Sequence, residues 1–384
     1  MQEDFLPIVR AHAARYPQMQ PQDYAKLAYQ SEYGPEHLVT DEAEAAAAIR
    51  AEWQALAGED DAGGCGARPE GPAAESGKGS SPAGPIGPAG AGGCWAEPIG
   101  GGLCRLHLAG PVLPDAPECL AWLFCRSAEH TGTPEGLGRR LEVLETLHIP
   151  HMAGWLTSYR TRGMPAVRHS PLYRAAYRPH YRVLLAGYAR YFAVLLAVYR
   201  LCRAGTPALV SIDGRCGSGK SSLAALLQRL FGCRVLHTDD FYLPPAQRAP
   251  GWETQPGGNM DFERLMREAI RPALAGQPID YRAYSCQQGR LLPPQRLAPA
   301  PLTLLEGSYS QHPALGAPYA LRVLLHCAPE EQARRLKARE EEYFETFQTR
   351  WIPLEEGYFA RYRIPEQCDV FVDTTGFFPD GPAA

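Results

Sequence analysis

The stretch DGRCGSGKSS at residues 213–222 limits the folds open to this chain more than any other feature. It fits the pattern of a glycine, four residues and then Gly-Lys-Ser, with Gly214 first and Lys220 in the pair. The apolar run ALVSI before it predicts a buried strand, and SLAALLQRLF after it has leucines at helical spacing. A loop between such a strand and helix turns backbone N–H groups and the positive helix end toward one point. The stretch therefore predicts a nucleotide phosphate-binding loop.

The motif assigns roles within this loop, which is called the phosphate loop below. Lys220 is expected to reach the β- and γ-phosphates of ATP, and the Ser221 hydroxyl to ligate Mg²⁺. A chance match in a chain with 38 glycines is the alternative, and the flanking strand and helix argue against it. The predicted cofactor-binding residues are Gly214, Arg215, Cys216, Gly217, Ser218, Gly219, Lys220, Ser221 and Ser222.

Composition narrows the class of protein. A chain of 384 residues has room for two or three domains, and its net charge of −4 argues against a nucleic-acid-binding surface. The 11 cysteines form no CxxC pair and no signal peptide is recognised, which suits reduced thiols in the cytoplasm. The apolar run 183–202 contains Arg190, so we expect a core helix and no membrane partner.

The chain divides by composition into three parts. Residues 1–182 predict a mainly helical α+β domain, with one half-buried strand at 102–108. Inside it, residues 58–93 are rich in Gly, Ala, Pro and Ser and predict a disordered insertion. Residues 183–206 predict a connecting helix, and residues 207–384 the domain that holds the phosphate loop.

The first domain carries few signals of function. Arginines alternate with aromatic residues over 167–174 and 177–182, where they could bind phosphate or a stacked base. A surface with inward tyrosines and solvated arginines is the alternative, and we favour it. Glu36 with His37, and also His107 and His130, lack a recognised metal spacing and are interpreted as structural residues.

The second half alternates strands with helices, which predicts an α/β fold with a five-stranded parallel sheet and helices on both faces. Asp239 and Asp240 follow a strand at 233–237, where one carboxylate could accept a proton, although an Asx turn is the alternative. Glu306 ends another strand, at the usual place of an acid that supports Mg²⁺. The further strands are expected at 208–212, 302–307, 321–326 and 369–373.

Arginines between the last two strands are candidates for contact with the transferred phosphoryl group. Arg339 and Arg350 lie in a basic and aromatic segment that could close over a nucleotide. A solvated helix with charge pairs four residues apart is the equally weighted alternative.

Together the motifs DGRCGSGKSS, HTDDFYLP, GNMDFERL and LLEGSYSQHP resemble the uridine kinase and phosphoribulokinase-like branch of phosphate-loop kinases. The resemblance covers about residues 207–375. It implies that Asp239 is the base for a sugar 5′-hydroxyl and that Glu306 supports Mg²⁺. The residues that it implies for acceptor binding are Tyr242, Asp261 and, in a base-recognising region at 281–286, Tyr284, with Arg339 as a lid arginine. The stretch from YQSEYGPEHL onward resembles a segment that is fused to such kinases in bacteria.

The sequence thus predicts an ATP- and Mg²⁺-dependent kinase that phosphorylates a hydroxyl of a small metabolite. Uridine or cytidine is the favoured acceptor, and another small alcohol such as pantothenate or a sugar is the alternative. A nucleotide-dependent regulatory ATPase that acts through the first half is the rival from another class. A homo-oligomer is left open.

Overall fold

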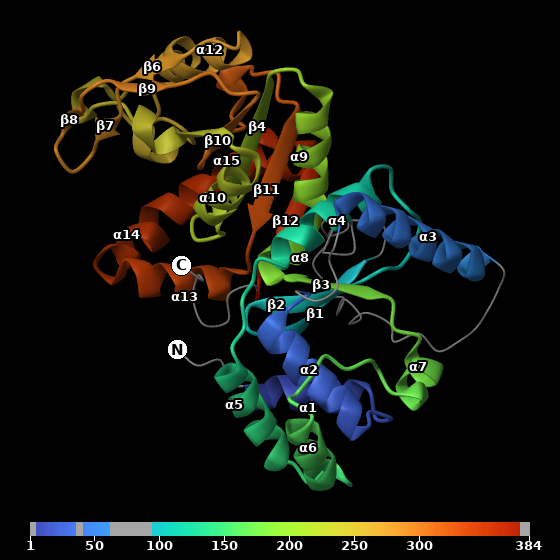
Figure 1. Ribbon diagram of the computed structural model, residues 1–384. Helices are drawn as coiled ribbons and strands as arrows, with labels where there is room; N and C mark the ends of the chain where they lie inside the picture. Colours follow the sequence, from blue (N-terminus) through green and yellow to red (C-terminus); the bar gives the residue numbers. More distant parts are fainter. Residues whose placement is uncertain (1–4, 36–40, 62–93, 377–384) are drawn as a thin grey trace. The chain divides into compact units, whose positions relative to one another are not determined.

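The computed structural model describes residues 5–35, 41–61 and 94–376, which form two compact units (Figure 1). Unit 1 runs up to Phe192 and unit 2 begins at Ala193. The insertion expected at 58–93 lies outside the described residues except for its first four, which continue a helix to Asp61. Glu36 and His37 also lie outside them. Within the described ranges, no helix is long and apolar enough to cross a bilayer, and no cysteine forms a disulfide.

Unit 1 is built on a three-stranded antiparallel sheet in the order β1-β2-β3. Its strands are β1 (Trp95–Gly100), β2 (Leu103–His107) and β3 (Tyr181–Leu185). The turn between β1 and β2 contains Gly101 at φ 64°, where an added Cβ would lie 2.2 Å from the carbonyl oxygen of Ser31. Glycine is therefore required at this close approach. The strand expected at 102–108 is β2, but all five of its residues are buried, so the expectation of a half-buried strand is wrong.

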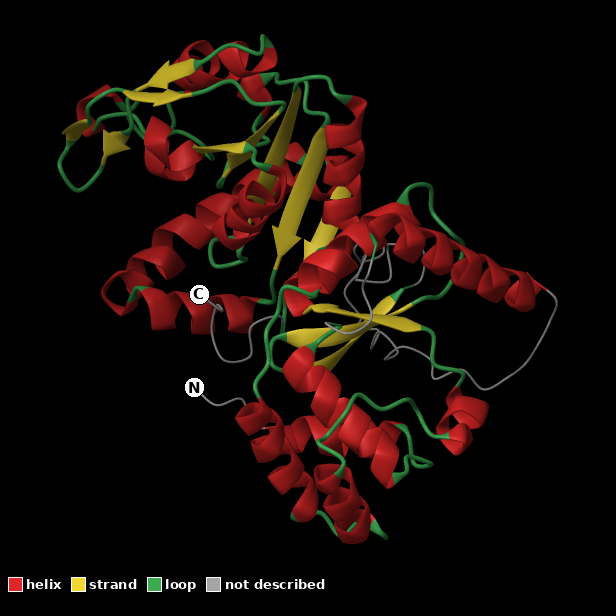
Figure 2. Ribbon diagram, in the orientation of Figure 1, coloured by secondary structure: helices red, strands yellow, loops and turns green. Residues whose placement is uncertain are grey.

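Helices surround this sheet (Figure 2). The first two contact β1, and an apolar core joins them to later helices through residues such as Val9, Leu27, Leu141 and Leu156. On α5 the buried leucines Leu137, Leu141 and Leu144 repeat at helical spacing, so this helix presents one apolar stripe to the core. The helices are α1 (Phe5–Arg15), α2 (Pro21–Tyr33), α3 (Glu42–Asp61), α4 (Ala116–Ser127), α5 (Pro134–Glu145), α6 (Met152–Thr161), α7 (Pro171–Tyr177) and α8 (Ala186–Arg190).

The expectation of a single connecting helix over 183–206 is wrong. The stretch begins inside β3, continues as α8 and then forms α9 (Phe192–Ala204). Val183 and Leu184 pair with Arg105 and Cys104 of β2, so the start of the apolar run completes a sheet. Periodicity alone does not separate a short buried strand from a buried helix, and here the pairing with β2 decides.

Unit 2 contains the predicted five-stranded parallel sheet, in the order β12-β11-β4-β10-β5. The strands are β4 (Ala208–Gly214), β5 (Arg234–His237), β10 (Leu302–Glu306), β11 (Leu321–His326) and β12 (Val370–Asp373). Glu306 at the end of β10 is in register with Ile212 and with His237. Because all five strands are parallel, the groups that follow their carboxyl ends meet at one edge.

Apolar residues on the strands pack against helices. Leu209, Leu305 and Leu324 share one core with Tyr358 and Phe359, while α10 contacts β4, β5 and β10. The helices are α10 (Lys220–Phe231), α11 (Phe262–Leu265), α12 (Arg271–Leu274), α13 (Pro329–Arg339), α14 (Phe344–Thr346), α15 (Ile352–Tyr362) and α16 (Ile364–Gln367). Two short hairpins complete the unit and pair β6 (Ile279–Tyr281) with β9 (Gln295–Leu297) and β7 (Tyr284–Ser285) with β8 (Arg290–Leu291).

The packing of β10 generates a test of this core. Leu305 is fully buried, so Leu305→Ala should lower the free energy of unfolding by about 2–5 kcal/mol. Leu172 is 48% exposed, and Leu172→Ala should stay within about 0.5 kcal/mol of the wild type. Urea unfolding of both variants measures the difference. Equal midpoints would contradict the core described for unit 2.

Candidate phosphate-binding and catalytic site

The phosphate loop joins β4 to α10 through glycines with positive φ. Gly214, Gly217 and Gly219 have φ of 143°, 77° and 92°. A Cβ on Gly214 would lie 2.1 Å from the carbonyl oxygen of Leu325 in β11, so no other residue fits there. Because α10 begins at Lys220, its unpaired N–H groups and positive end face the loop.

Lys220 and Ser221 are the first two residues of α10. The Lys220 ammonium donates to the carbonyl oxygens of Gly214 at 2.7 Å and Arg215 at 3.1 Å, so it lies across the loop. The Ser221 hydroxyl donates to Glu306 Oε1 at 3.2 Å. The structure therefore brings the two predicted Mg²⁺-supporting oxygen groups together at the first turn of α10.

A histidine that the sequence analysis did not select also contacts Glu306. His237, the last residue of β5, has its Nδ1 2.6 Å from Glu306 Oε1. The hydrogen bond to this carboxylate raises the pKa of His237. The sequence could have predicted this contact, because His237 and Glu306 each end a strand and both strands were expected to end at the same edge of the sheet. Among the described residues, no group of three or more His, Cys, Asp or Glu forms a metal site by itself.

The two adjacent aspartates have different surroundings. Asp239 is exposed and accepts a hydrogen bond from the Tyr242 hydroxyl at 2.7 Å. Asp240 accepts one from the Tyr281 hydroxyl at 2.9 Å, and burial raises the pKa of Asp240. Asp239 is thus the carboxylate of the pair that a solute can reach.

The other predicted acceptor residues lie around Tyr242. An isolated antiparallel bridge pairs Tyr242 with Met260, and the backbone N–H of Asp261 donates to Phe241. This pairing brings Asp261 beside the Tyr242 segment, although its carboxylate caps α11 and pairs with Arg264 at 3.2 Å. Tyr284 is buried in β7, which contacts the turn at 238–241.

Asp213, at the start of the loop motif, has a role that the sequence analysis did not assign. Its fully buried carboxylate accepts hydrogen bonds from the backbone N–H of Gly214 at 2.8 Å and Gln311 at 3.0 Å. It also accepts one from the Tyr358 hydroxyl of α15 at 2.7 Å. Burial outweighs these bonds and raises the pKa of Asp213 to about 6. One carboxylate therefore links the phosphate loop to the segment after β10 and to α15.

Neither arginine proposed from the sequence contacts the phosphate loop through a hydrogen bond that the structure shows. Arg339 is exposed and pairs with Glu340 at 2.8 Å, while Arg350 is exposed 6.0 Å from the ring centre of Trp351. Arg335, one helical turn before Arg339, donates to Gly217 O at 3.1 Å and to Thr374 O at 2.6 Å. Nothing in the charge pattern separated Arg335 from its basic neighbours.

Side chains of helices α13 and α15 also form hydrogen bonds with the backbone of the phosphate loop at Cys216. Gln332 donates to the carbonyl oxygen of Cys216 at 3.0 Å, and the backbone N–H of Cys216 donates to Glu355 at 2.9 Å. The Arg215 guanidinium pairs with Glu356 of α15 and contacts His326. In this arrangement the Arg215 side chain is engaged by α15.

A cavity of about 210 Å³ lies beside the first residues of the loop. Arg215, Glu356 and His326 contribute polar groups to it, and Phe359 and Phe371 contribute aromatic faces.

Comparisons with known proteins find likeness in structure only. No family model and no curated protein matches the chain. A possible uridine kinase from Bacillus stearothermophilus shares 19% identity with a TM-score of 0.37, over 47% of this chain and 100% of that one. A candidate fructose transport system kinase from Silicibacter shares 17% identity with a TM-score of 0.36, over 47% of this chain and 97% of that one. At this similarity, function has to be argued from the side chains.

The close approach at Gly214 gives a testable consequence. Gly214→Ala should abolish nucleotide binding and lower stability, because its Cβ overlaps a backbone carbonyl that cannot move aside. Gly232→Ala is the matched control. Gly232 also has a positive φ, but a Cβ added to it would meet no described atom outside its chain neighbours within 4 Å. It should cost about 1–2 kcal/mol and leave nucleotide binding intact. Equal nucleotide affinity in the two variants would contradict the loop geometry.

The buried Asp213 predicts a pH dependence. Its folded-state pKa of about 6 lies above the ordinary value of 3.8, so the folded protein binds more protons than the unfolded chain between these values. Stability from this group should therefore fall as pH rises from about 4 to about 6, by up to about 3 kcal/mol.

The measurement is urea unfolding of the wild type and of Asp213→Asn across this range. The free-energy difference between the wild type and the variant should shift in favour of the wild type toward pH 4. A difference that does not change with pH would contradict the raised pKa of Asp213.

Proposed function

We propose that unit 2 is an ATP- and Mg²⁺-dependent kinase that transfers the γ-phosphoryl group to a hydroxyl of a small metabolite. One juxtaposition carries the proposal. The phosphate loop, the Ser221–Glu306 oxygen pair and the accessible Asp239 all follow the carboxyl ends of three adjacent strands. A phosphate site, a cation site and a proton acceptor at one edge are the parts that phosphoryl transfer to an alcohol needs.

The residues fit the implied cofactors. The amides of the loop and the positive end of α10 suit phosphate oxygens, and the third proton of the Lys220 ammonium is left to a ligand. A hydroxyl with a carboxylate is a donor set that Mg²⁺ takes together with phosphate oxygens and water. When bound, the cation would neutralise charge on the phosphates. Ser221 and Glu306 would hold the cation, and Glu306 would then bind the cation with the oxygen that now contacts His237.

Asp239 would act on the acceptor. Its carboxylate takes the proton of the acceptor hydroxyl while the new oxygen–phosphorus bond forms and the bond from the γ-phosphorus to ADP breaks. The Tyr242 hydroxyl fixes one carboxylate oxygen, which leaves the other for the acceptor. Asp240 is engaged by Tyr281 and supports the turn.

For the acceptor we propose the 5′-hydroxyl of uridine or cytidine, on the strength of the motif resemblance. Asp261, next to the Tyr242 segment, would orient the sugar hydroxyls, and Tyr284 would border the acceptor. Pantothenate or a simple sugar would keep the same chemistry with a different acceptor. Arg335 replaces Arg339 and Arg350 as the arginine best placed near the phosphates, because it contacts Gly217 of the loop.

The base assignment predicts a kinetic signature. Asp239→Asn should lower kcat about 10²- to 10⁴-fold and leave ATP affinity unchanged, because only proton transfer is lost. Asp240→Asn is the matched control and should retain more activity, since its carboxylate is already bonded to Tyr281. ADP release across a panel of uridine, cytidine, pantothenate and simple sugars provides the assay, with Lys220→Ala as the blank.

Release that needs one acceptor and vanishes with Lys220→Ala would support the kinase and name its substrate class. Wild-type turnover by Asp239→Asn would contradict the role of Asp239. Slow release that is indifferent to every acceptor would contradict the kinase and favour a regulatory ATPase.

A further inference from the structure

The sheet of unit 1 buries charged groups on a face where an apolar core is expected. Glu97 of β1 is in register with Arg105 of β2, and Trp95 with His107. Glu97, Arg105 and His107 are 6%, 1% and 8% exposed. Period-two alternation puts all four side chains on the same face of the sheet. Burying charges costs several kcal/mol per ion, so their presence needs an explanation beyond folding.

Neighbouring elements add polar groups to this face. Helix α1 contributes His12 and Arg15, which both lie 3.8 Å from the Glu97 carboxylate, and Tyr16 follows directly after the helix. Helix α2 contributes Lys26 and Gln30. In the segment at 167–182, His169 and Tyr173 are buried and Tyr181 is half-buried, so the tyrosines lie inward as the favoured interpretation predicts.

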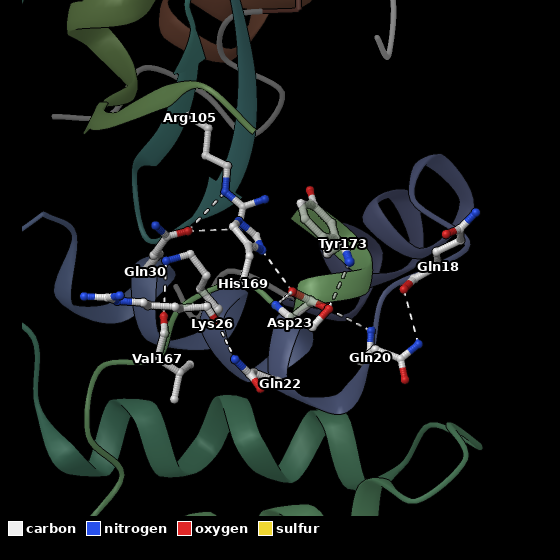
Figure 3. A network of polar contacts seen from close by, with 12 residues as sticks. Gln18, Gln20, Gln22, Asp23, Lys26, Gln30, Arg105, Val167, His169 and Tyr173 are labelled. Atoms are coloured by element: carbon white, nitrogen blue, oxygen red, sulfur yellow. Dashed lines mark hydrogen bonds and ion pairs between the residues drawn. The ribbon is translucent and has the colours of Figure 1, made fainter. Parts of the chain in front are cut away.

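One end of the cluster is fully bonded and acts as a scaffold (Figure 3). The Asp23 carboxylate accepts hydrogen bonds from the backbone N–H of Gln20 and from both the N–H and the hydroxyl of Ser170. His169 Nδ1 donates to Asp23 at 3.0 Å, and the Tyr181 hydroxyl lies 2.7 Å from His169 Nε2. These bonds leave Asp23 with no capacity for a ligand.

The other end is not fully bonded. Two buried acceptors there, His12 Nδ1 and Glu97 Oε1, reach no hydrogen-bond partner by distance and angle among the described residues, and the buried Tyr16 hydroxyl lies beside the Glu97 carboxylate. His12 Nε2 donates to the carbonyl oxygen of Pro98 at 2.9 Å, so neutral His12 turns its Nδ1 lone pair toward Glu97. The 3.8 Å separates His12 Nδ1 from Glu97 Oε2, which also lies 3.3 Å from His107 Nε2, so the acceptors left for a ligand donor are His12 Nδ1 and Glu97 Oε1.

Arg105 and Lys26, the cations near this end, have N–H groups that form no hydrogen bond with the described residues. Arg105 Nε and Nη2 both donate to the amide oxygen of Gln30, while Nη1 lies 3.5 Å from Glu97. Within the described part of the chain, Lys26 makes one hydrogen bond, to the carbonyl oxygen of Val167 at 3.2 Å. Figure 3 shows the side chains of Lys26, Gln30 and Arg105 converging.

The cluster also carries a surplus of positive charge. Burial lowers the pKa of His12 to about 4 and that of His169 to about 3, and it lowers the pKa of His107, so these histidines are neutral. Burial and then Arg105 lower the pKa of Lys26 to about 8, which still leaves it charged near neutrality. Three cations, Arg15, Arg105 and Lys26, therefore face two anions, Asp23 and Glu97.

Four residues of the cluster are partly exposed to solvent. The Arg15 side chain is 27% exposed, and Trp95, Lys26 and Tyr181 are only partly buried. Arg15 lies over the Trp95 ring at 4.2 Å, and that ring stacks on His107. An aromatic wall with cations beside it suits a small charged solute.

We propose that unit 1 holds a second ligand site, for a small anionic metabolite that also carries hydroxyl groups. Arg105 and Lys26 bind the anionic group, whether phosphate or carboxylate, and Glu97 with His12 accepts hydrogen bonds from the hydroxyls. The site is independent of the phosphate loop, and the kinase proposal can fail without affecting it.

The test uses the full-length protein with Lys220→Ala, which removes the lysine of the phosphate loop. The probes form two matched pairs, ribose 5-phosphate with inorganic phosphate, and citrate with tricarballylate, which is citrate without its hydroxyl. Hydrogen–deuterium exchange read by mass spectrometry reports which segments each probe protects.

We expect ribose 5-phosphate to protect residues 20–33, 95–107 and 167–185 more strongly than inorganic phosphate does, or citrate to protect them more strongly than tricarballylate does. Protection confined to 213–222, or absent at probe concentrations of about 10 mM, would overturn the site. Equal protection by inorganic phosphate and ribose 5-phosphate, or by tricarballylate and citrate, would overturn the role of Glu97 and His12 in binding the alcohol hydroxyls. Whether ribose 5-phosphate or citrate protects these segments distinguishes a phosphate from a carboxylate ligand.

Lys26→Met provides the variant, because Lys26 is partly exposed and makes a single hydrogen bond to the described residues, so the fold should survive. It should weaken binding roughly tenfold or more, the loss of one charge-assisted bond. Arg174→Met is the matched control, since Arg174 is exposed on α7, and it should bind as the parent does. Equal affinity of Lys26→Met and Arg174→Met would overturn the proposal.

Discussion

The buried carboxylate of Asp213 is the contact on which the site of unit 2 depends. It accepts hydrogen bonds from the phosphate loop, from the segment after β10 and from α15, so three elements far apart in sequence share one acceptor. A carboxylate in such a place is costly unless it is fully bonded, and here every bond comes from an element that borders the site. The same contact couples the loop to the α13–α15 region, where Gln332 and Glu355 bind the backbone of Cys216. A movement of the α13–α15 region would therefore displace the phosphate loop.

Most of the fold of unit 2 and part of its candidate site could be predicted from local sequence patterns. The five strands are short apolar runs between helices, and the loop motif after the first strand identifies a phosphate site and the start of a helix. Asp239 and Glu306 could be selected because they lie at or just after strand ends, and parallel strands end at one edge. The contacts of Asp213 and Arg335 depend on α13 and α15, which lie more than 100 residues from the loop along the chain. No local pattern reports such partners.

Unit 1 shows why the remainder was harder to predict. Its strand at 103–107 reads as LCRLH, and every residue of it is buried, so alternation did not reveal which face is charged. His107, which was interpreted as structural, contacts Glu97 and stacks on Trp95, and no pattern in the sequence indicated these two partners. The tyrosines of the segment at 167–182 do turn inward, as one interpretation held, but they meet charged groups there. Such a cluster appears only when β1, β2 and two helices are placed together.

The central claim is that unit 2 transfers a phosphoryl group to a small molecule, and one measurement tests it without a choice of acceptor. The protein is incubated with Mg²⁺, ATP labelled at the γ-phosphate and a mixture of cell metabolites below about 1 kDa, and the labelled products are separated. The account predicts label in a small organic product with the wild type and none with Lys220→Ala. Label found only in inorganic phosphate, or equally in both proteins, would contradict it.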